Sequence, residues 1–374
     1  MTLDAEHPTP SSLDAERRDL RDLILEELEE SVIAAGERKF RARQIMAWLW
    51  ARGVESLDAM VDVPAALRRR LAAQFALGTL SFSAARSADG TCKLLVALAD
   101  GEAIESVIIP AARRLTLCLS SQVGCAMGCE FCATARMGLH RNLTAAEMAG
   151  QVIMARRELG PDTPLTNFVF MGMGEPLANY PQLARTLRIM TAPWGLGISP
   201  RRITVSTVGL IAGMERLLAE FQVNLAVSLH ATTDETRNRI VPVNRRFPLG
   251  DLLEACQRLP IARRNRITFE YVMLEEINDS PADARRLVKL MRPMRAKVNL
   301  LFFNPFPAAP FRPSPRPRVE DFLELLRQGN LTATLRESRG HDIAAACGQL
   351  YAEHKGVVNH NPLRRATPSP AELQ

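Results

Sequence analysis

The chain has 374 residues, 47% hydrophobic and 24% charged, a length that suits two or three domains or one large α/β domain with small additions. It has no long apolar run, and its acidic, polar N-terminus lacks the features of a signal peptide, so we expect no membrane span and a cytoplasmic location. The net charge of +6, carried mainly by arginine, is compatible with a polyanionic partner but does not require one.

The first 76 residues have the pattern of a small helical domain, and residues 1–14 are expected to be disordered. Helically spaced apolar residues predict three helices, over Leu13–Ala35, Arg41–Ala51 and Pro64–Gln74. The second of these helices contains Trp48 and Trp50. Because large aromatic side chains usually belong to cores, we expect at least one of the two to be buried.

From residue 77 to residue 111 the pattern changes to three short strands, with turns at Asp89-Gly90 and Asp100-Gly101. Strands and helices then alternate from residue 112 to about residue 340, beginning with the strand LTLCLSSQ. Further strands are predicted over Asn167–Met171, Ile203–Ser206, Val223–Ser228, Ile267–Met273, Val298–Phe303 and Leu331–Leu335. Helices are predicted over Thr144–Leu159, Pro181–Met190, Leu210–Glu220, Leu249–Arg258, Pro281–Arg292 and Val319–Gln328.

This alternation predicts a parallel sheet, or a partial or complete barrel, with functional side chains at the C-terminal ends of the strands. The segment APFRPSPRPR at 309–318 is expected to be a loop rich in proline and arginine. Residues 341–374 are expected to form a tail without clear regular structure at its end.

Three of the seven cysteines, Cys125, Cys129 and Cys132, form a CxxxCxxC motif, which in a cytosolic chain favours metal binding over disulfides. Three thiolates leave one iron of a four-iron cluster open, and S-adenosylmethionine (SAM) can bind there through its amino and carboxylate groups. The alternative is a zinc site, which usually has four ligands with cysteines in CxxC pairs. No second CxxC occurs, only His140 is nearby, and Phe131 precedes the last cysteine, so the motif favours the iron–sulfur cluster.

Polar residues also follow other predicted strands. Glu175, in GMGEP, could bind a cationic ammonium group, although an ordinary turn between a strand and a helix has the same pattern. GMGEP lacks the lysine of a P-loop and the glycine spacing of a dinucleotide site. Ser206 and Ser228 end two further strands, and His230 could be a ligand contact, a core histidine or a helix cap.

Longer segments are more specific than any of these motifs: IESVIIP, LCLSSQVGCAMGCEFCATARMGLHRNL, FVFMGMGEPL, RRITVSTVGL, LAVSLHATTDETRNRIVPVN, FFNPFP and RGHDIAAACGQL. Together they resemble the RlmN/Cfr family of radical-SAM RNA adenosine methyltransferases, and its RlmN branch most of all. The resemblance extends from KFRARQIMAWLW to CGQL. It implies an α/β fold, a partial (β/α)6 radical-SAM barrel with a small N-terminal helical domain and a short β extension.

The resemblance also implies roles for individual residues. A 4Fe-4S cluster would be held by Cys125, Cys129 and Cys132. SAM would be bound by Gly174, Glu175, Ser206, Ser228, Leu229, His230 and Asn304. For catalysis, Cys347 would be the cysteine that carries the methyl group. Cys118 would be the thiol that releases the product and leaves a disulfide, and Glu105 would be the base.

Without the resemblance, the same catalytic positions have ordinary interpretations. Cys347 and Cys118 would be small buried hydrophobes and Glu105 a surface carboxylate. Cys92 and Cys256 are expected to be structural in either case.

The reaction implied is methylation of carbon 2 of an adenosine in 23S rRNA, with tRNA as a second substrate of some members. Carbon 2 is electron-poor and does not attack SAM as a nucleophile, so one SAM would methylate Cys347 and a second would generate a radical on that methyl group. A small electron donor such as a flavodoxin or ferredoxin is implied, and we expect a monomer. Candidate contacts with the RNA backbone are the helical domain, Arg136, His140, Arg141, Arg201, Arg202 and the loop Arg312–Arg318.

Three other functions remain open at this stage. The first is methylation of carbon 8, as in the Cfr branch. The second is another radical-SAM reaction, which would not need the pair Cys118 and Cys347. The third is an RNA-binding module with a structural metal ion.

Overall fold

The computed structural model describes residues 17–262, 265–307 and 309–352, so the stretch 1–14 and residues 353–374 of the tail lie outside the described residues. Within the described residues, ten strands form one sheet in the order β1-β2-β3-β4-β7-β8-β9-β10-β11-β12. Their bounds are β1 (Ser81–Arg86), β2 (Cys92–Ala97), β3 (Ala103–Ala111), β4 (Arg114–Cys118), β7 (Asn167–Phe170), β8 (Ile203–Thr207), β9 (Asn224–Ser228), β10 (Ile267–Met273), β11 (Ala296–Phe302) and β12 (Ala333–Arg336).

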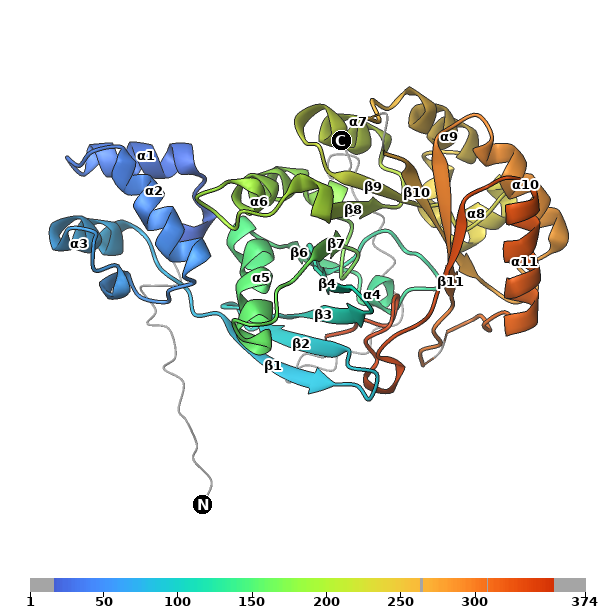
Figure 1. The fold of residues 1–374 in the computed structure, drawn as a ribbon, viewed down its shortest axis with the longest axis horizontal. Coiled ribbons are helices and arrows are strands. Elements are labelled where there is room, and N and C mark those ends of the chain that lie inside the picture. Colours follow the sequence, from blue (N-terminus) through green and yellow to red (C-terminus); the bar gives the residue numbers. More distant parts are fainter. Residues whose placement is uncertain (1–16, 263–264, 308, 353–374) are drawn as a thin grey trace, which may run out of the picture.

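The sheet has an antiparallel part and a parallel part (Figure 1). Strands β1 to β4 pair antiparallel, whereas the strands from β4 to β12 in the sheet order pair parallel. Helices connect the parallel strands, with bounds α5 (Ala145–Leu159), α6 (Tyr180–Thr191), α7 (Ile211–Glu220), α8 (Asp234–Ile240), α9 (Leu249–Arg258), α10 (Pro281–Met291) and α11 (Arg316–Gln328). The described chain therefore contains six strand–helix units followed by β12, and the linear strand order leaves the barrel partial. This confirms the expected fold, with the β extension continuing the barrel sheet.

The residue types found in each strand follow from which of its faces are buried. All seven residues of β10 are buried, as expected for a parallel strand with both faces covered, yet the strand contains the charged Glu270. In β2, by contrast, Cys92, Leu94 and Val96 are buried and alternate with more accessible residues. A charged side chain in a fully buried strand needs an internal partner or a ligand cavity, and Glu270 lines such a cavity.

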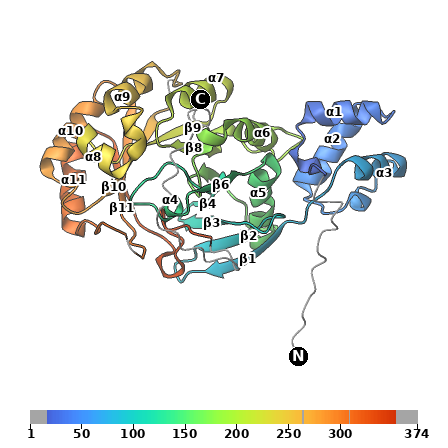
Figure 2. The same ribbon diagram turned by 180° about the vertical axis from the view of Figure 1, so that it is seen from behind.

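The helical domain stands at one end of the molecule, away from β11 and α11 (Figures 1 and 2). Its helices are α1 (Leu25–Ala34), α2 (Phe40–Met46), which continues as a π-helical turn over Ala47–Ala51, and α3 (Ala65–Gln74). Trp50 is buried in its core, as expected for at least one of the tryptophans. Trp48 is half-buried, and the guanidinium of Arg52 lies 3.7 Å from the centroid of its ring.

The single helix predicted over Leu13–Ala35 is wrong within the described residues. A short 3-10 turn covers Leu20–Asp22, and α1 begins only at Leu25. Tertiary contacts break the periodic pattern: the buried guanidinium of Arg21 donates to the carbonyls of Gly78 and Val54, and Asp22 accepts a hydrogen bond from the amide of Ala146 in α5.

Other differences from the predicted elements are small or local. β12 ends at Arg336, and α11 already begins at Arg316 within the predicted loop 309–318. The sequence patterns did not predict α8 or the elements around the cysteine motif, which are the two-stranded pair β5 (Gln122–Gly124) and β6 (Leu139–Asn142) and the short helix α4 (Ala133–Arg136). None of the helices in the described part of the chain has the length and hydrophobicity that crossing a bilayer requires.

Candidate active site

One cavity brings together most of the residues singled out from the sequence. It is lined by side chains from the C-terminal ends of the parallel strands and the loops that follow them. Those of the predicted site are Cys125, Cys129, Cys132, Gly174, Glu175, Ser206, Ser228, His230, Asn304 and Cys347. Three predicted residues, Glu105, Cys118 and Leu229, are not part of this lining.

Strands β5 and β6 lie on either side of the cysteine motif in the chain and pair with each other. Gly124, at the end of β5, has φ of +75°, and a Cβ there would lie 1.8 Å from the carbonyl oxygen of Gly138. The amide of Cys125 donates to that same carbonyl (2.8 Å). Only glycine permits such a close approach of the two backbones, so the loop returns tightly enough to present its thiols to the cavity.

The three thiols of the motif suit an iron–sulfur cluster. Burial raises the pKa of Cys125 to about 12 and raises the pKa values of Cys129 and Cys132 as well, so metal binding would have to supply the energy that stabilises their thiolates. All three line one cavity together with candidate SAM contacts. This donor set fits a four-iron cluster with one iron left for a small ligand.

Glu175 is held by the backbone around it. Its amide donates to the side-chain oxygen of Gln122 (2.8 Å), while its two carboxylate oxygens accept hydrogen bonds from the amides of Leu177 (3.0 Å) and Val208 (2.9 Å). Burial raises its pKa to about 7. Gly174, with φ of +95°, packs so closely on Gln122 that a Cβ would lie 2.5 Å from the Gln122 side chain. GMGEP is therefore both a tight turn after β7 and part of the cavity wall.

His230 combines two of the interpretations left open by the sequence, because it is buried and also lines the cavity. Its φ of +60° is unusual for a residue other than glycine. Its Nδ1 accepts the amide hydrogen of Val272 (3.0 Å), and burial lowers its pKa to about 3. The imidazole is therefore neutral with Nε2 protonated, and its ring meets that of Phe131 edge-on at 4.6 Å.

Leu229 has a supporting position. Its side chain is fully buried, and its carbonyl accepts a hydrogen bond from the guanidinium of Arg237 (3.1 Å). The same guanidinium donates to the carbonyl of Val208 (2.7 Å) and to the side chain of Asn244 (2.8 Å). Arg237 thus ties together the loops after β8 and β9 that carry candidate SAM contacts.

Cys347 lies on a segment anchored at several points. Asn304, after β11, donates to the carbonyl of Cys347 (3.1 Å), and the carbonyl of Gly348 accepts the amide hydrogen of Ala133, next to the cysteine motif (2.7 Å). The hydroxyl of Thr134 donates to the carbonyl of Leu350 (2.7 Å). These bonds place Cys347 at the cavity wall beside the motif, although more than 200 residues separate them in the chain.

Cys118 lies near Cys347 but behind the cavity wall. It ends β4 and is 5% exposed, and burial, with a smaller contribution from Cys347, raises its pKa to about 12. The cationic Arg336 opposes this shift and interacts electrostatically with both cysteines. Both cysteines are free thiols in this structure.

Glu105, on β3, is also buried outside the cavity. One of its carboxylate oxygens pairs with the ammonium of Lys93 on β2 (2.7 Å), and the other accepts the amide hydrogen of Tyr351 (2.9 Å). The segment that carries Cys347 therefore also covers Glu105. This contradicts the interpretation of Glu105 as an ordinary surface carboxylate.

Two charged residues of the cavity were missed in the sequence. Glu270 accepts from Asn299 (3.0 Å) through one oxygen, and its second oxygen has no hydrogen-bond partner in the described residues. Its position in an otherwise nearly apolar strand was a usable signal. Arg336, at the end of β12, could not be recognised from the sequence, because the chain is rich in arginine.

Several of the charges proposed for RNA contacts are paired within the chain. His140 lies 3.1 Å from Glu102, and Arg141 pairs with Asp100 (2.5 Å) and Glu147 (2.8 Å). In and near the proline-rich segment, paired arginines include Arg312, Arg316 and Arg318. Ion pairs at exposed positions are weak and can exchange for phosphate, so pairing does not remove these residues as contacts.

Comparisons with known proteins agree with this arrangement. Residues 18–77 match the model described as the ribosomal RNA large subunit methyltransferase N-terminal domain, and residues 119–288 match the radical SAM superfamily. The chain is 49% identical over 336 residues to the dual-specificity RNA methyltransferase RlmN of Syntrophobacter fumaroxidans, covering 90% of this chain and 98% of that protein. It is 52% identical over 343 residues to that of Anaeromyxobacter dehalogenans, covering 90% and 92%.

A solved structure is similar along the same length. A radical SAM methyltransferase from Sphaerobacter thermophilus superposes with a TM-score of 0.85 at 47% identity, covering 90% of this chain and all of that one. Radical SAM enzymes use a 4Fe-4S cluster and SAM, so these are the cofactors of this enzyme, and the zinc alternative is wrong. With matches at both the helical domain and the barrel, and relatives about half identical over nine tenths of its length, the chain belongs to the RlmN family of radical SAM RNA methyltransferases.

Proposed function

We propose that this enzyme methylates carbon 2 of a specific adenosine in 23S rRNA, and also an adenosine beside the anticodon of tRNA. The observation that carries the proposal is the position of Cys347, which shares a cavity wall with the three cysteines of the motif. Membership of the RlmN family, whose relatives are named as dual-specificity methyltransferases, favours carbon 2 over carbon 8 and over other radical-SAM reactions.

The residues around the cavity then divide into two groups. Cys125, Cys129 and Cys132 hold the cluster, while the backbone at Gly174 and the polar side chains that line the cavity bind SAM. Within the first group, Cys129 is buried and Cys125 and Cys132 are half-buried, which would limit the access of water to a bound cluster. When bound, the cluster and SAM supply a methyl group and the means to abstract a hydrogen atom from it.

Cys347 is the methyl carrier in this proposal. Its sulfur takes the methyl group, because carbon 2 of adenine lies between two ring nitrogens and is too electron-poor to do so itself. Asn304 and Ala133 fix the backbone on either side of the sulfur through their hydrogen bonds to Cys347 and Gly348. The carbon that the sulfur carries can then join the base, which links protein and RNA covalently.

Cys118 and Glu105 complete the reaction. Glu105 removes the ring proton as a general base, and Cys118, once its thiol has lost its proton, then attacks the sulfur of Cys347. The bond between that sulfur and the added carbon breaks with its electron pair on the carbon, which takes up a proton to become the methyl group as the RNA leaves. The product of this attack is a disulfide between Cys118 and Cys347. The position of Arg336 supports the pairing, because this guanidinium lines the cavity together with Cys347 and interacts with both cysteines.

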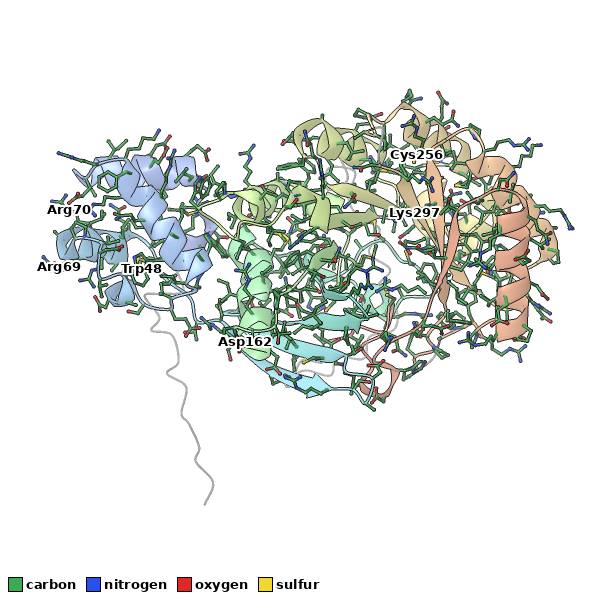
Figure 3. All side chains as sticks on the ribbon, viewed as in Figure 1. Trp48, Arg69, Arg70, Asp162, Cys256 and Lys297 are labelled. Carbon is green, nitrogen blue, oxygen red and sulfur yellow. The ribbon has the colours of Figure 1, made fainter. Side chains whose placement is uncertain are left out.

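The partners follow from the substrate. The domain over residues 1–76 is proposed as an RNA-binding accessory domain, and Figure 3 shows Trp48, Arg69 and Arg70 on it, at the end of the molecule far from α10 and α11. The target adenosine must be unstacked for its ring edge to enter the cavity. A small flavodoxin or ferredoxin would supply electrons, and we propose a monomeric enzyme of the cytoplasm, where ribosomes and tRNA are found.

The test is anaerobic incubation of the reconstituted enzyme with methyl-labelled SAM, a reductant and protein-free 23S rRNA or tRNA, followed by nucleoside mass analysis. We expect 2-methyladenosine from both RNAs together with 5′-deoxyadenosine. Formation of 8-methyladenosine instead would overturn the position of methylation, and SAM cleavage without RNA methylation would overturn the substrate.

A further inference from the structure

The pair formed by Lys93 and Glu105 is buried within the β extension. The ammonium of Lys93 lies 2.7 Å from a carboxylate oxygen of Glu105, and the two side chains are 17% and 5% exposed. In the register of β2 and β3, Lys93 stands opposite Val107 and Leu95 stands opposite Glu105. Lys93 and Glu105 are therefore diagonal neighbours on one face of the sheet.

Cys118 shares this face. Val107 stands opposite Cys118 in the antiparallel pair of β3 and β4. Residues that stand opposite each other in antiparallel strands point to the same side, and so do residues two apart in one strand. Lys93, Glu105 and Cys118 consequently point to the same side of the sheet from three adjacent strands.

The backbone of Glu105 is fixed to the barrel. Its carbonyl accepts a hydrogen bond from the hydroxyl of Ser120 (2.6 Å), and its amide donates to the sulfur of Met173 (3.3 Å), the residue before Gly174. The position of Glu105 is thus set by the same strand ends that carry the site. Only its side chain can adjust.

The two carboxylate oxygens of Glu105 have different partners. Oε1 pairs with Lys93, a side chain of the sheet itself, whereas Oε2 accepts the amide hydrogen of Tyr351 (2.9 Å), four residues after Cys347. A carboxylate buried without a cation prefers its neutral form, and a neutral carboxyl group cannot take a proton. A general base at this depth therefore needs a permanent cationic partner on one oxygen and a free second oxygen.

We propose that Lys93 is the positioning residue of the base, a role that rests on the proposed function of Glu105. Lys93 balances the negative charge of the Glu105 carboxylate and holds Oε1, and Oε2 takes the proton once the Tyr351 amide gives way to the RNA base. In this step the carbon 2–hydrogen bond breaks, its electron pair stays in the ring, and the proton forms a bond with Oε2. The Cys347 segment thus covers the base until a substrate displaces it.

The test uses the full-length, cluster-loaded enzyme and the variants Lys93→Met and Lys93→Arg, with Lys289→Met as a control at an exposed position on α10. Methylation of Cys347, formation of the protein–RNA adduct and release of methylated RNA are measured separately from pH 6 to pH 9. In Lys93→Met we expect the first two steps to persist while release at pH 7 slows by roughly tenfold or more and recovers as the pH rises. Lys93→Arg should retain most of the release rate, and the control all of it.

Release by Lys93→Met with the rate and pH profile of the unmodified enzyme would overturn the role of Lys93. An unmodified enzyme that forms no 2-methyladenosine would instead overturn the proposed function. A second measurement then still tests the pair: the infrared difference spectrum between each protein and its Glu105→Gln derivative. We expect an ionised carboxylate band at pH 7 with Lys93 and a protonated carboxyl band in Lys93→Met, and an unchanged carboxylate band in that variant would contradict the proposal.

Discussion

The side-chain amide of Asn304 donates a hydrogen bond of 3.1 Å to the carbonyl of Cys347 and so joins the end of β11 to the segment that carries the proposed methyl acceptor. Asn304 is 3% exposed and also lines the cavity. A residue that the sequence resemblance assigns to SAM binding therefore also positions the sulfur that SAM would methylate.

Replacing Asn304 with alanine should slow methylation of Cys347. Loss of one hydrogen bond, worth about 1 kcal/mol, corresponds to roughly a fivefold effect, and lost contact with SAM would add to it. The rate is measured in a single turnover by peptide mass analysis of Cys347. An unchanged rate at saturating SAM would show that the bond does not position the cysteine.

Cys347→Ala should form no methylated RNA, because Cys347 is the one cysteine outside the CxxxCxxC motif among the described residues that line the cavity, while 5′-deoxyadenosine formation should persist. Cys256→Ala is the matched control, a buried cysteine on α9 that Figure 3 shows away from the helical domain and that lies outside the cavity lining. It should retain methylation. RNA methylation by Cys347→Ala would contradict the carrier role.

Cys118→Ala should accumulate a covalent protein–RNA species, since the adduct can form but has no thiol to release it. The species is detected by denaturing electrophoresis with labelled RNA and, after nuclease digestion, by the mass of the peptide that contains Cys347. Multiple turnovers without adduct would show that another group releases the product.

His230 should stay neutral from pH 8 down to pH 5. Burial lowers its pKa from 6.5 to about 3, so the unfolded chain binds a proton at this position before the native one does. Its contribution to stability is therefore full above pH 6.5 and is lost as the pH falls toward 3. The ¹⁵N spectrum of labelled histidine should show an unprotonated Nδ1 and a protonated Nε2.

The variant His230→Asn assigns this signal, because its spectrum should lack the His230 resonance and keep those of the other histidines. Asparagine tolerates the positive φ and can offer an oxygen to the amide of Val272, so the variant should fold. A signal that titrates near pH 6 would contradict the burial of the ring.

Gly124→Ala should lose the cluster. A Cβ at this position would lie 1.8 Å from the carbonyl oxygen of Gly138, so β5 and β6 would have to separate and the three thiols would lose their spacing. Iron and sulfide content and the absorption spectrum measure the loss. Gly250→Ala on α9, where a Cβ meets no atom within 4 Å, should keep the cluster and gain up to about 1 kcal/mol in stability.

Local pattern alone predicted most of the regular structure. The alternation after residue 112 predicted the parallel strands and their helices to within a few residues, because apolar periodicity reflects which face each element buries. The spacing of Cys125, Cys129 and Cys132 favoured a cluster because those ligands lie in one loop. The resemblance, which extends over most of the chain, supplied the SAM contacts and the distant Cys347.

What only the tertiary structure decided depends on contacts between segments far apart in the chain. The break before α1 follows from the burial of Arg21 against Gly78 and Val54, which no local period encodes. The pairing of Lys93 with Glu105, and the cover provided by Tyr351, require strand register and the return of the C-terminal segment. A side chain's charge is visible in the sequence, but its partner is chosen by whichever group the folded chain brings within hydrogen-bond distance once water has been excluded.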